Sequence, residues 1–346
     1  MLLRASFGYL GIILIVALFC TSCKESSVSN ETIQPGSRNY EWKTDTIYAP
    51  YNLFGKISGT SPVDIWIVND GDPERAFYHF DGLHWTTDSI RRTIIPTSIY
   101  SLSPTSVWCG GCEGKIWHYN GQNWTEKYRH SIMGYPTIII EDIYAVSEID
   151  IYAVGQYRNQ SETERWGLIL HFNGQIWEQL PITNVRTEFI KIRKDIDGTF
   201  YLWGITNEQY IESTFQFYSF NGQKITQIKS GTLANDQLGN ILELGNRVYF
   251  IIGYDFFKYA NGNFNRVGRL SDSPRFINAG IGRSEKDILI GFLDGIAHYN
   301  GDDTEYLIRF SEQVNITGFK IFEKDIFIVA ADMRGNNLIL HGILRK

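Results

Sequence analysis

Short apolar runs, rich in β-branched and aromatic side chains, recur along the chain from about residue 40 onwards. One type of run occurs seven times, and a further apolar run, such as Ile138-Ile139-Ile140, precedes each copy. The seven copies begin at Asp64, Ser106, Asp150, Phe200, Val248, Asp287 and Asp325. Side chains of these types favour β-strands. No long segment with a helical period follows residue 23, so we expect almost no helix.

A turn phrase follows most of these runs. It consists of an aromatic or small residue, then Asn-Gly or Asp-Gly, and in three copies a Trp three residues later (Trp85, Trp124 and Trp177). The turn glycines are Gly82, Gly121, Gly174, Gly222, Gly262 and Gly301, separated by about 40 to 50 residues. Asn-Gly between apolar runs is typical of a β-hairpin with a type I′ turn. Each repeat therefore predicts four short strands.

Four strands over such a repeat length are typical of a propeller blade. The sequence therefore predicts an all-β fold, a seven-bladed β-propeller with four-stranded antiparallel blades. The seventh repeat ends after Gly342 without an outermost strand, whereas residues 42–47 resemble the outermost strand at residues 85–90. We expect this N-terminal strand to complete the last blade, which would remove a free edge. A six-bladed ring with one extra hairpin is the alternative, and it would leave both ends unpaired.

The first 22 residues have the pattern of an export signal, with Arg4 before an apolar segment at residues 10–19. That segment is too short to span a membrane comfortably. Thr21-Ser22-Cys23 resembles a bacterial lipobox, although Cys20 stands where Leu is usual. We therefore expect residues 1–22 to be a lipoprotein signal peptide and Cys23 to carry the lipid. Ordinary cleavage without lipid is the alternative.

Residues 23–38 are polar and predict a flexible tether, so that residues 39–346 form the propeller domain. Lys24 follows the lipidated position, in place of the Asp that favours inner-membrane retention. This resemblance implies an outer-membrane lipoprotein of a Gram-negative cell envelope, periplasmic or surface-exposed. The formal net charge of −6 and the absence of a basic run argue against nucleic acid. We expect a monomer that contacts the membrane through its lipid alone.

The pieces Ile151-Tyr152-Ala153-Val154-Gly155, residues 169–174 and Asn120-Gly121-Gln122-Asn123-Trp124 resemble kelch-like and BNR-like bacterial propellers. The resemblance covers about residues 40 to 346. Kelch repeats carry paired glycines, which occur here only at Gly110-Gly111, and the sialidase Asp-box is absent. The resemblance therefore implies a fold and no chemistry.

Five of the seven histidines occupy one repeat position: His79, His118, His171, His298 and His341. Equivalent positions in different blades lie far apart, beyond the short distances that a metal requires of its ligands. We therefore expect a repeated hydrogen bond within each blade, no metal and no cofactor.

Cys109 and Cys112 are the remaining cysteines after Cys20 and Cys23. The C-x-x-C spacing is compatible with a redox centre, half a metal site or a tight disulfide. A redox pair works at a helix N-terminus, and this pair follows a predicted strand. We expect a disulfide between Cys109 and Cys112, with two free thiols as the alternative.

Loops between the second and third strands often shape the ligand face of such propellers. Every predicted blade carries an acid in this loop, and the longer loops add basic and aromatic side chains. The candidate ligand-face residues are Asp72, Arg75, Glu113, Arg158, Glu162, Arg165, Trp166, Glu208, Tyr210, Asp255, Asp294 and Asp332. Acids flanked by Arg and aromatic residues suit a glycan or a peptide, although turns are polar in any case.

The sequence contains no nucleophile motif, metal cluster or phosphate loop. We therefore predict a non-enzymatic binding or scaffolding module with a protein or glycan partner. The alternative is a glycan-active hydrolase or lyase with its site on the loop face, because propellers also host enzymes. A structural role in an envelope complex is a third hypothesis, and it predicts an exposed apolar patch on one face.

Overall fold

The computed structural model describes residues 34–345, apart from 50–52, 183–184, 207–212 and 233–238. The described residues form β-strands joined by turns and loops, as the sequence predicts. No helix in this part of the chain is long and apolar enough to cross a membrane. Cys23, Glu208 and Tyr210 lie outside the described residues.

The strands form five four-stranded sheets and one eight-stranded sheet. The first sheet contains β2 (Phe54–Ser61), β3 (Asp64–Asn69), β4 (Phe77–Phe80) and β5 (Trp85–Thr86). The second contains β6 (Pro96–Ser103), β7 (Ser106–Gly111), β8 (Lys115–Tyr119) and β9 (Trp124–Arg129). The third contains β10 (Thr137–Ser147), β11 (Asp150–Arg158), β12 (Arg165–Phe172) and β13 (Trp177–Gln179). The fourth contains β14 (Glu188–Lys194), β15 (Phe200–Thr206), β16 (Thr214–Phe220) and β17 (Ile225–Thr232).

The eight-stranded sheet consists of two antiparallel halves. One half contains β18 (Gly239–Leu244), β19 (Arg247–Ile252), β20 (Asp255–Ala260) and β21 (Asn263–Arg269). The other contains β22 (Phe276–Ser284), β23 (Asp287–Phe292), β24 (Gly295–Tyr299) and β25 (Thr304–Arg309). A single parallel pair, Leu244 with Gly282, joins the halves.

The last sheet is built from both ends of the chain. β26 (Val314–Ile321), β27 (Asp325–Asp332) and β28 (Asn336–Leu344) are consecutive, and β1 (Tyr40–Tyr48) is the fourth strand. β1 is antiparallel to β28, with Tyr40 opposite Leu344 and Tyr48 opposite Asn336. The predicted completion of this sheet by the N-terminal strand is confirmed.

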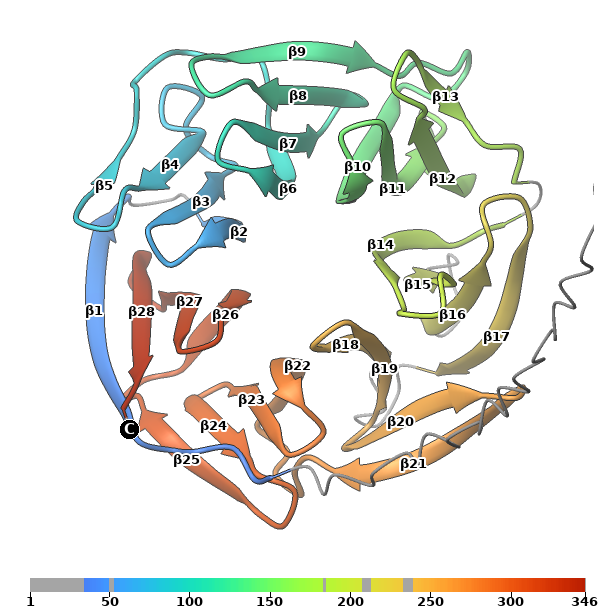
Figure 1. Ribbon diagram of the computed structural model, residues 1–346. Helices are drawn as coiled ribbons and strands as arrows, with labels where there is room; N and C mark the ends of the chain where they lie inside the picture. The colour runs from blue at the N-terminus through green and yellow to red at the C-terminus, as the bar shows by residue number, and fades with distance from the viewer. Residues whose placement is uncertain (1–33, 50–52, 183–184, 207–212, 233–238, 346) are drawn as a thin grey trace, which may run out of the picture. The chain divides into compact units, whose positions relative to one another are not determined.

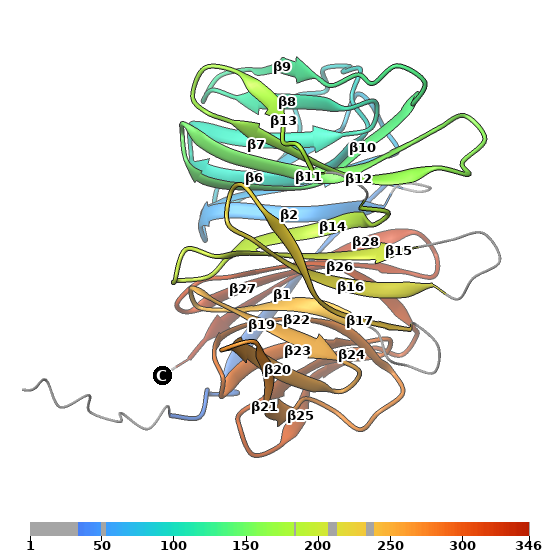
Figure 2. The same ribbon diagram turned by 90° about the vertical axis from the view of Figure 1, so that its right-hand side faces the viewer.

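The sheets follow one another around a ring (Figure 1). The first strands of successive four-stranded units contact each other in a closed cycle, β2, β6, β10, β14, β18, β22, β26 and again β2. Neighbouring sheets stack face to face (Figure 2). The connections between strands lie at the two ends of the ring. We call one of them the turn end; it contains the turns that join the first strand of each sheet to the second and the third to the fourth. The other, which contains the loops between the second and third strands, is the loop end.

Aromatic side chains fill the space between neighbouring sheets. The ring of Trp124 stacks on that of Phe77 in the preceding sheet, with centroids 3.9 Å apart. Trp177 meets Trp108 of the preceding sheet edge-on at 5.7 Å, and the Trp85 indole donates to Asp45 of β1. These tryptophans, which recur at one position of the repeat, therefore contact the neighbouring sheet. Edge-on and offset pairs of this kind are favourable beyond the area that they bury.

The turn phrase has a different geometry from the one that its sequence predicts. Positive φ at both central residues, as a type I′ turn requires, occurs at Asn261-Gly262. At the other copies the Asn or Asp starts a longer turn, so that Asn120 Oδ1 accepts from the amides of Gln122 and Asn123. Gly121 has φ +91° and lies so close to Thr105 that a Cβ would clash. Glycine is therefore required here for both reasons.

The repeated histidines hold the second and third strands of their sheets together. His79 Nε2 lies 2.8 Å from Asp64 Oδ1, and the pairs His171–Asp150, His298–Asp287 and His341–Asp325 have separations of 2.8, 2.9 and 2.8 Å. Ser106 replaces the Asp in the second sheet and lies 3.0 Å from His118 Nε2. The predicted hydrogen bond within each repeat is confirmed for all five histidines.

Replacement of Asp64 by Asn should test the contribution of this pair to stability. Burial alone would raise the pKa of Asp64, but hydrogen bonds from His79 and Thr60 lower it below the ordinary range. The pair therefore stabilises the fold fully above about pH 4, and the stabilisation is lost as the pH falls through the lowered pKa. We expect Asp64→Asn to reduce the free energy of unfolding by about 2 kcal/mol at pH 7.

Urea unfolding between pH 7 and pH 2 would measure this difference. We expect the difference in the free energy of unfolding between the wild type and Asp64→Asn to become smaller below pH 4. Asp70→Asn, which changes an exposed carboxylate nearby, is the control and should be as stable as the wild type. A gap that stays constant down to pH 2 would contradict the assignment.

Candidate functional site

Two cavities lie on the axis of the ring. The larger, which we call the wide cavity, has a volume of about 550 Å³ and is lined by residues of all seven first strands. The smaller, the narrow cavity, has a volume of about 190 Å³. Both are lined by Ile57, Arg193, Glu243, Ile281 and Phe319, so they are successive parts of one channel.

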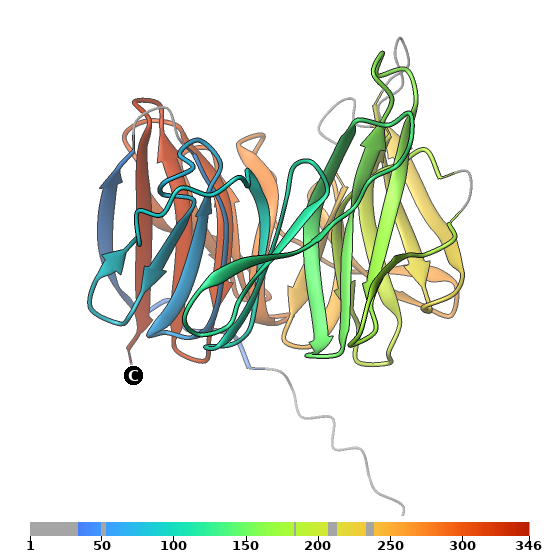
Figure 3. The same cartoon turned by 90° about the horizontal axis from the view of Figure 1, so that it is seen from above.

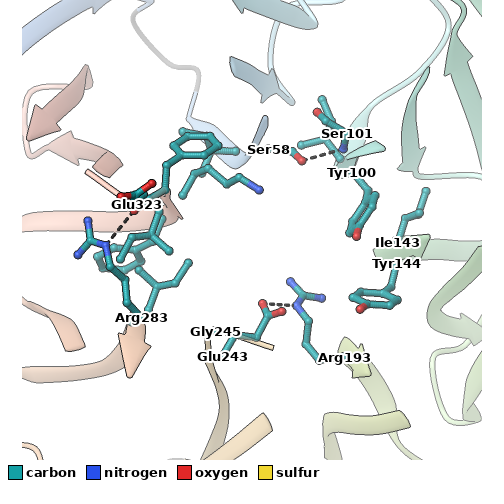
Figure 4. A pocket seen from close by; sticks show the side chains of 18 residues that line it. Ser58, Tyr100, Ser101, Ile143, Tyr144, Arg193, Glu243, Gly245, Arg283 and Glu323 are labelled. Atoms are coloured by element: carbon teal, nitrogen blue, oxygen red, sulfur yellow. Dashed lines mark hydrogen bonds and ion pairs between the residues drawn. The ribbon is translucent and has the colours of Figure 1, made fainter. Parts of the chain in front are cut away.

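The wide cavity opens toward the turn end. Its lining includes the last residues of the first strands and reaches Gly245 and Glu323 in the turns that follow β18 and β26. The narrow cavity is lined by earlier residues of the same strands, such as Lys56 and Asp142. Figure 4 shows the wide cavity with Tyr100 and Tyr144 on one side and Arg283 and Glu323 on the other.

A bulge recurs in the first strands and directs polar side chains into the channel. The register shifts by one residue just before Lys56, Asp142 and Lys191 in β2, β10 and β14. All three residues line the narrow cavity. A bulge leaves one extra residue unpaired and re-aims the side chains that follow it. The polar lining therefore depends on a repeated backbone feature.

One ion-pair cluster crosses three sheets inside the channel. The Arg193 guanidinium of β14 contacts the carboxylates of Asp142 on β10 and, at 2.6 Å, Glu243 on β18. Burial alone would lower the pKa of Arg193, but the two carboxylates raise it. Arg193 in turn lowers the pKa of Glu243, against the effect of burial. Arg193 and Glu243 therefore stay ionised, and the cluster joins three neighbouring first strands.

Lys191 is the most strongly perturbed amine of the channel. Burial, together with the nearby charge of Arg193, lowers its pKa to about 8. Its Nζ donates to the carbonyl oxygen of Ile241 at 3.0 Å. A perturbed group in a cavity is a candidate for chemistry, but buried structural networks shift pKa values in the same way. Here the hydrogen bond across to β18 gives Lys191 a structural role.

The described ligand-face residues lie at the loop end, opposite the mouth of the wide cavity. Figure 3 shows the β11–β12 loop, in green, projecting at this end. None of the described ones lines the wide or the narrow cavity. Glu113 lines a separate cavity of about 410 Å³.

Each of these loop acids has a partner close to it in the chain or in its own sheet. Asp72 pairs with Arg75 at 3.9 Å, Glu113 with Lys115 at 2.9 Å, and Glu162 with both Arg158 and Arg165 at 3.7 and 3.3 Å. Asp255 pairs with Arg266 at 3.0 Å, Asp294 with Arg275 at 2.7 Å, and Asp332 accepts bonds from Asn336 and from the amide of Arg334. Trp166 lies under the guanidinium of Arg186. These side chains order the loops to which they belong.

The predicted disulfide between Cys109 and Cys112 is not formed in the structure, where both are free cysteines. The prediction assumed that the strand ends at this pair and that a turn brings the two cysteines together, but the strand does not turn after Cys109. β7 continues to Gly111, Cys112 bridges to Ile139, and the turn follows at Glu113 and Gly114. Three residues of extended strand span about 10 Å, whereas a disulfide needs Cα atoms closer than about 7 Å.

Both thiols should stay free and react slowly. Burial raises the pKa of Cys109 and, together with the charge of Glu141, that of Cys112. In a form of the protein that begins at Lys24, iodoacetamide should modify Cys112 slowly and Cys109 after unfolding in urea. Mass spectrometry would measure both reactions, with Cys112→Ser as the control that lacks the slow site. Failure of either thiol to react in urea without a reductant would contradict this expectation.

Among the described residues, no group of three or more His, Cys, Asp or Glu side chains is placed to hold a metal ion. No described histidine lines the wide or the narrow cavity.

Solved structures with similar folds are known, but sequence comparisons find nothing. No family model and no curated protein matches the chain. YCF48 bound to D1 peptide matches with a TM-score of 0.62 and 13% identity, over 91% of this chain and 100% of that one. A streptogramin B lyase matches with a TM-score of 0.62 and 12% identity, over 87% and 97%.

A third similar structure is a catalytically inactive histidine-to-alanine variant of the virginiamycin B lyase of Staphylococcus aureus with quinupristin. Its TM-score is 0.60 at 12% identity, over 87% of this chain and 99% of that one. The chain has a β-propeller fold. At this level of identity the similarity shows the fold alone, because one propeller architecture serves both binding proteins and enzymes.

Proposed function

We propose that this protein is a seven-bladed propeller lipoprotein of the bacterial cell envelope, which binds a protein partner without catalysis at the wide cavity. The blade count treats the two halves of the eight-stranded sheet as separate blades. One parallel residue pair joins them, whereas each half has a full antiparallel ladder. The closed cycle of contacts among the first strands supports the same count.

The envelope address rests on the first residues of the chain, which lie outside the described part. The export pattern, the lipobox-like Thr21-Ser22-Cys23 and the following Lys24 support a lipid on Cys23 and the outer membrane of a Gram-negative cell. The kelch-like and BNR-like resemblance supports the same kind of bacterial propeller. We regard the predicted tether at residues 23–38 as the link between the lipid and the propeller. Its last residues contact the propeller, since the Gly36 amide donates to Lys286 O at 2.8 Å and Arg38 pairs with Glu305 at 3.1 Å.

The wide cavity carries the proposal of binding. It is large enough for a few peptide residues, it opens at one end of the ring, and apolar and polar groups converge in it, as is typical of a ligand site. The peptide bound by the structurally similar YCF48 supports a protein partner. We expect the loop end to play a smaller part, because its acids are already paired with local cations.

An enzyme is the alternative, and the similar lyase structures favour it. A glycan-active hydrolase or lyase on the loop face would need its acids gathered in one site. Described acids such as Asp72, Glu162 and Asp294 belong to different sheets and pair within their own loops. We therefore place the binding module first and the enzyme second.

Site-specific photocrosslinking in living cells would test the proposed function. A photoreactive phenylalanine analogue at Tyr144, in the wide cavity, should cross-link a protein, which mass spectrometry identifies and titration calorimetry with the purified partner then confirms. The same analogue at the exposed Thr125 of β9 is the control and should give no product. If Tyr144 gives no protein adduct and the purified protein cleaves an envelope glycan, the enzyme alternative is correct.

A further inference from the structure

The channel has an excess of positive charge in an acidic protein. The side chains that line the two cavities include five cations, Lys56, Lys191, Arg193, Arg283 and Lys320, and three carboxylates, Asp142, Glu243 and Glu323. The whole chain has a formal net charge of −6. Charges of one sign inside a low-dielectric cleft concentrate their field there. The channel is therefore suited to an anion.

On the wall formed by β22 and β26, Arg283 is paired with Asp287 at 3.2 Å, whereas Lys320 has no such partner in the described part of the chain. Arg193 is occupied by Asp142 and Glu243, and Lys191 donates to a carbonyl oxygen. Among the described residues, Lys320 has no carboxylate within ion-pair distance, and its ammonium lies 5.4 Å from the centre of the Phe322 ring. A cation in such surroundings is stabilised when an anion replaces its lost hydration.

Arg283 brings a second unused donor to the same wall. Its Nε donates to Phe322 O and its Nη1 to the Tyr40 hydroxyl, both at 2.9 Å, and Nη1 also contacts Asp287 Oδ2 at 3.2 Å. Its Nη2 is buried and has no hydrogen-bond partner in the described part of the chain. A buried donor without a partner carries a desolvation cost that a ligand oxygen would remove.

The opposite wall offers hydroxyl groups. The rings of Tyr100 and Tyr144 lie edge-on with centroids 5.4 Å apart, and both line the wide cavity (Figure 4). Burial raises the pKa of both hydroxyls, so they remain protonated and donate hydrogen bonds. Neither hydroxyl has a hydrogen-bond partner among the described residues. Acceptors such as peptide carbonyl oxygens suit this wall.

Apolar side chains are also exposed at the turn end, the end at which the wide cavity opens. Val63, Ile149 and Ile196 occupy the turns after the first strands β2, β10 and β14, with 60%, 65% and 55% of their surface exposed. Leu83 and Ile176, in third-to-fourth turns, are exposed at the same end. Exposed apolar groups around a polar pocket are typical of protein-interaction sites. A glycan would make little use of them.

We propose that the wide cavity takes a carboxylate of an acidic polypeptide segment against Lys320 and Arg283, while the exposed apolar side chains of the turn end contact hydrophobic side chains of the same segment. This inference rests on the proposed binding function and names the chemistry of the partner. The aspartates and glutamates of the segment, or its C-terminal carboxylate, supply the anion. The carboxylate of Glu323, which also lines the wide cavity, would repel further negative charges of a strongly acidic segment.

Three pools of random octapeptides on beads would test the inference. All three contain leucine, valine and phenylalanine; the first adds aspartate and glutamate, the second asparagine and glutamine, and the third lysine. We expect the labelled full-length protein to select the acidic pool. Fluorescence anisotropy of selected peptides should show about a tenfold loss of affinity for Lys320→Gln, as is typical when one charge-assisted contact is removed. Lys320→Arg should retain binding, because it keeps the charge.

Lys324→Gln is the matched control, since it makes the same charge change in the turn after β26 at a side chain that does not line the cavity. It should bind as wild type, and all variants should show the same thermal unfolding. Peptide binding without acidic preference, or unchanged affinity of Lys320→Gln, would refute the inference and leave the proposed function standing. Absence of binding to every pool also refutes it, and the cross-linking at Tyr144 then decides the proposed function independently. Binding of an oligouronate in place of any peptide would make the partner a glycan and overturn both.

Discussion

The antiparallel pairing of β1 with β28 closes the ring, and the rest of the structure depends on it. Without β1 the last sheet would keep three strands, the long strand β28 would be left as its unpaired edge, and the two ends of the chain would no longer share a sheet. Closure also reaches the candidate site, because the Tyr40 hydroxyl of β1 accepts a hydrogen bond from Arg283 on the wall of the wide cavity. The first strands can line a channel because the ladder of the last sheet holds the cycle together.

Features that recur in the sequence could be predicted from it. Copies of a strand, a turn or a histidine can be aligned with one another, so the role of one copy explains the others. His79 and His171 are the same residue in two repeats, and each pairs with an aspartate at the start of the neighbouring strand. The resemblance of residues 42–47 to residues 85–90 identifies β1 as an outermost strand, because a strand that lacks a partner in its own repeat must find one elsewhere.

Features that depend on a single repeat, or on contacts between repeats, could not be predicted. The disulfide prediction was wrong because the strand continues to Gly111, and nothing in C-x-x-C shows where a strand ends. The charged channel could not be predicted because Asp142, Arg193 and Glu243 belong to three sheets and meet across them. Asp142 and Glu243 do stand out in the sequence as charged residues among mostly apolar neighbours, but Arg193 lies in a strand with three other charged residues. The loop acids led the sequence analysis to predict the ligand site at the loop end instead, although acidic residues are common in turns.

Hydrogen exchange of the backbone amides of β1 tests the closure most directly. If β1 completes the last sheet, its amides that face β28 should be protected to nearly the same extent as those between β27 and β28, since they open with the same sheet. Rapid exchange throughout residues 40–48, with β27 and β28 still protected, would contradict the account. It would also remove Tyr40 as the support of Arg283 in the wide cavity.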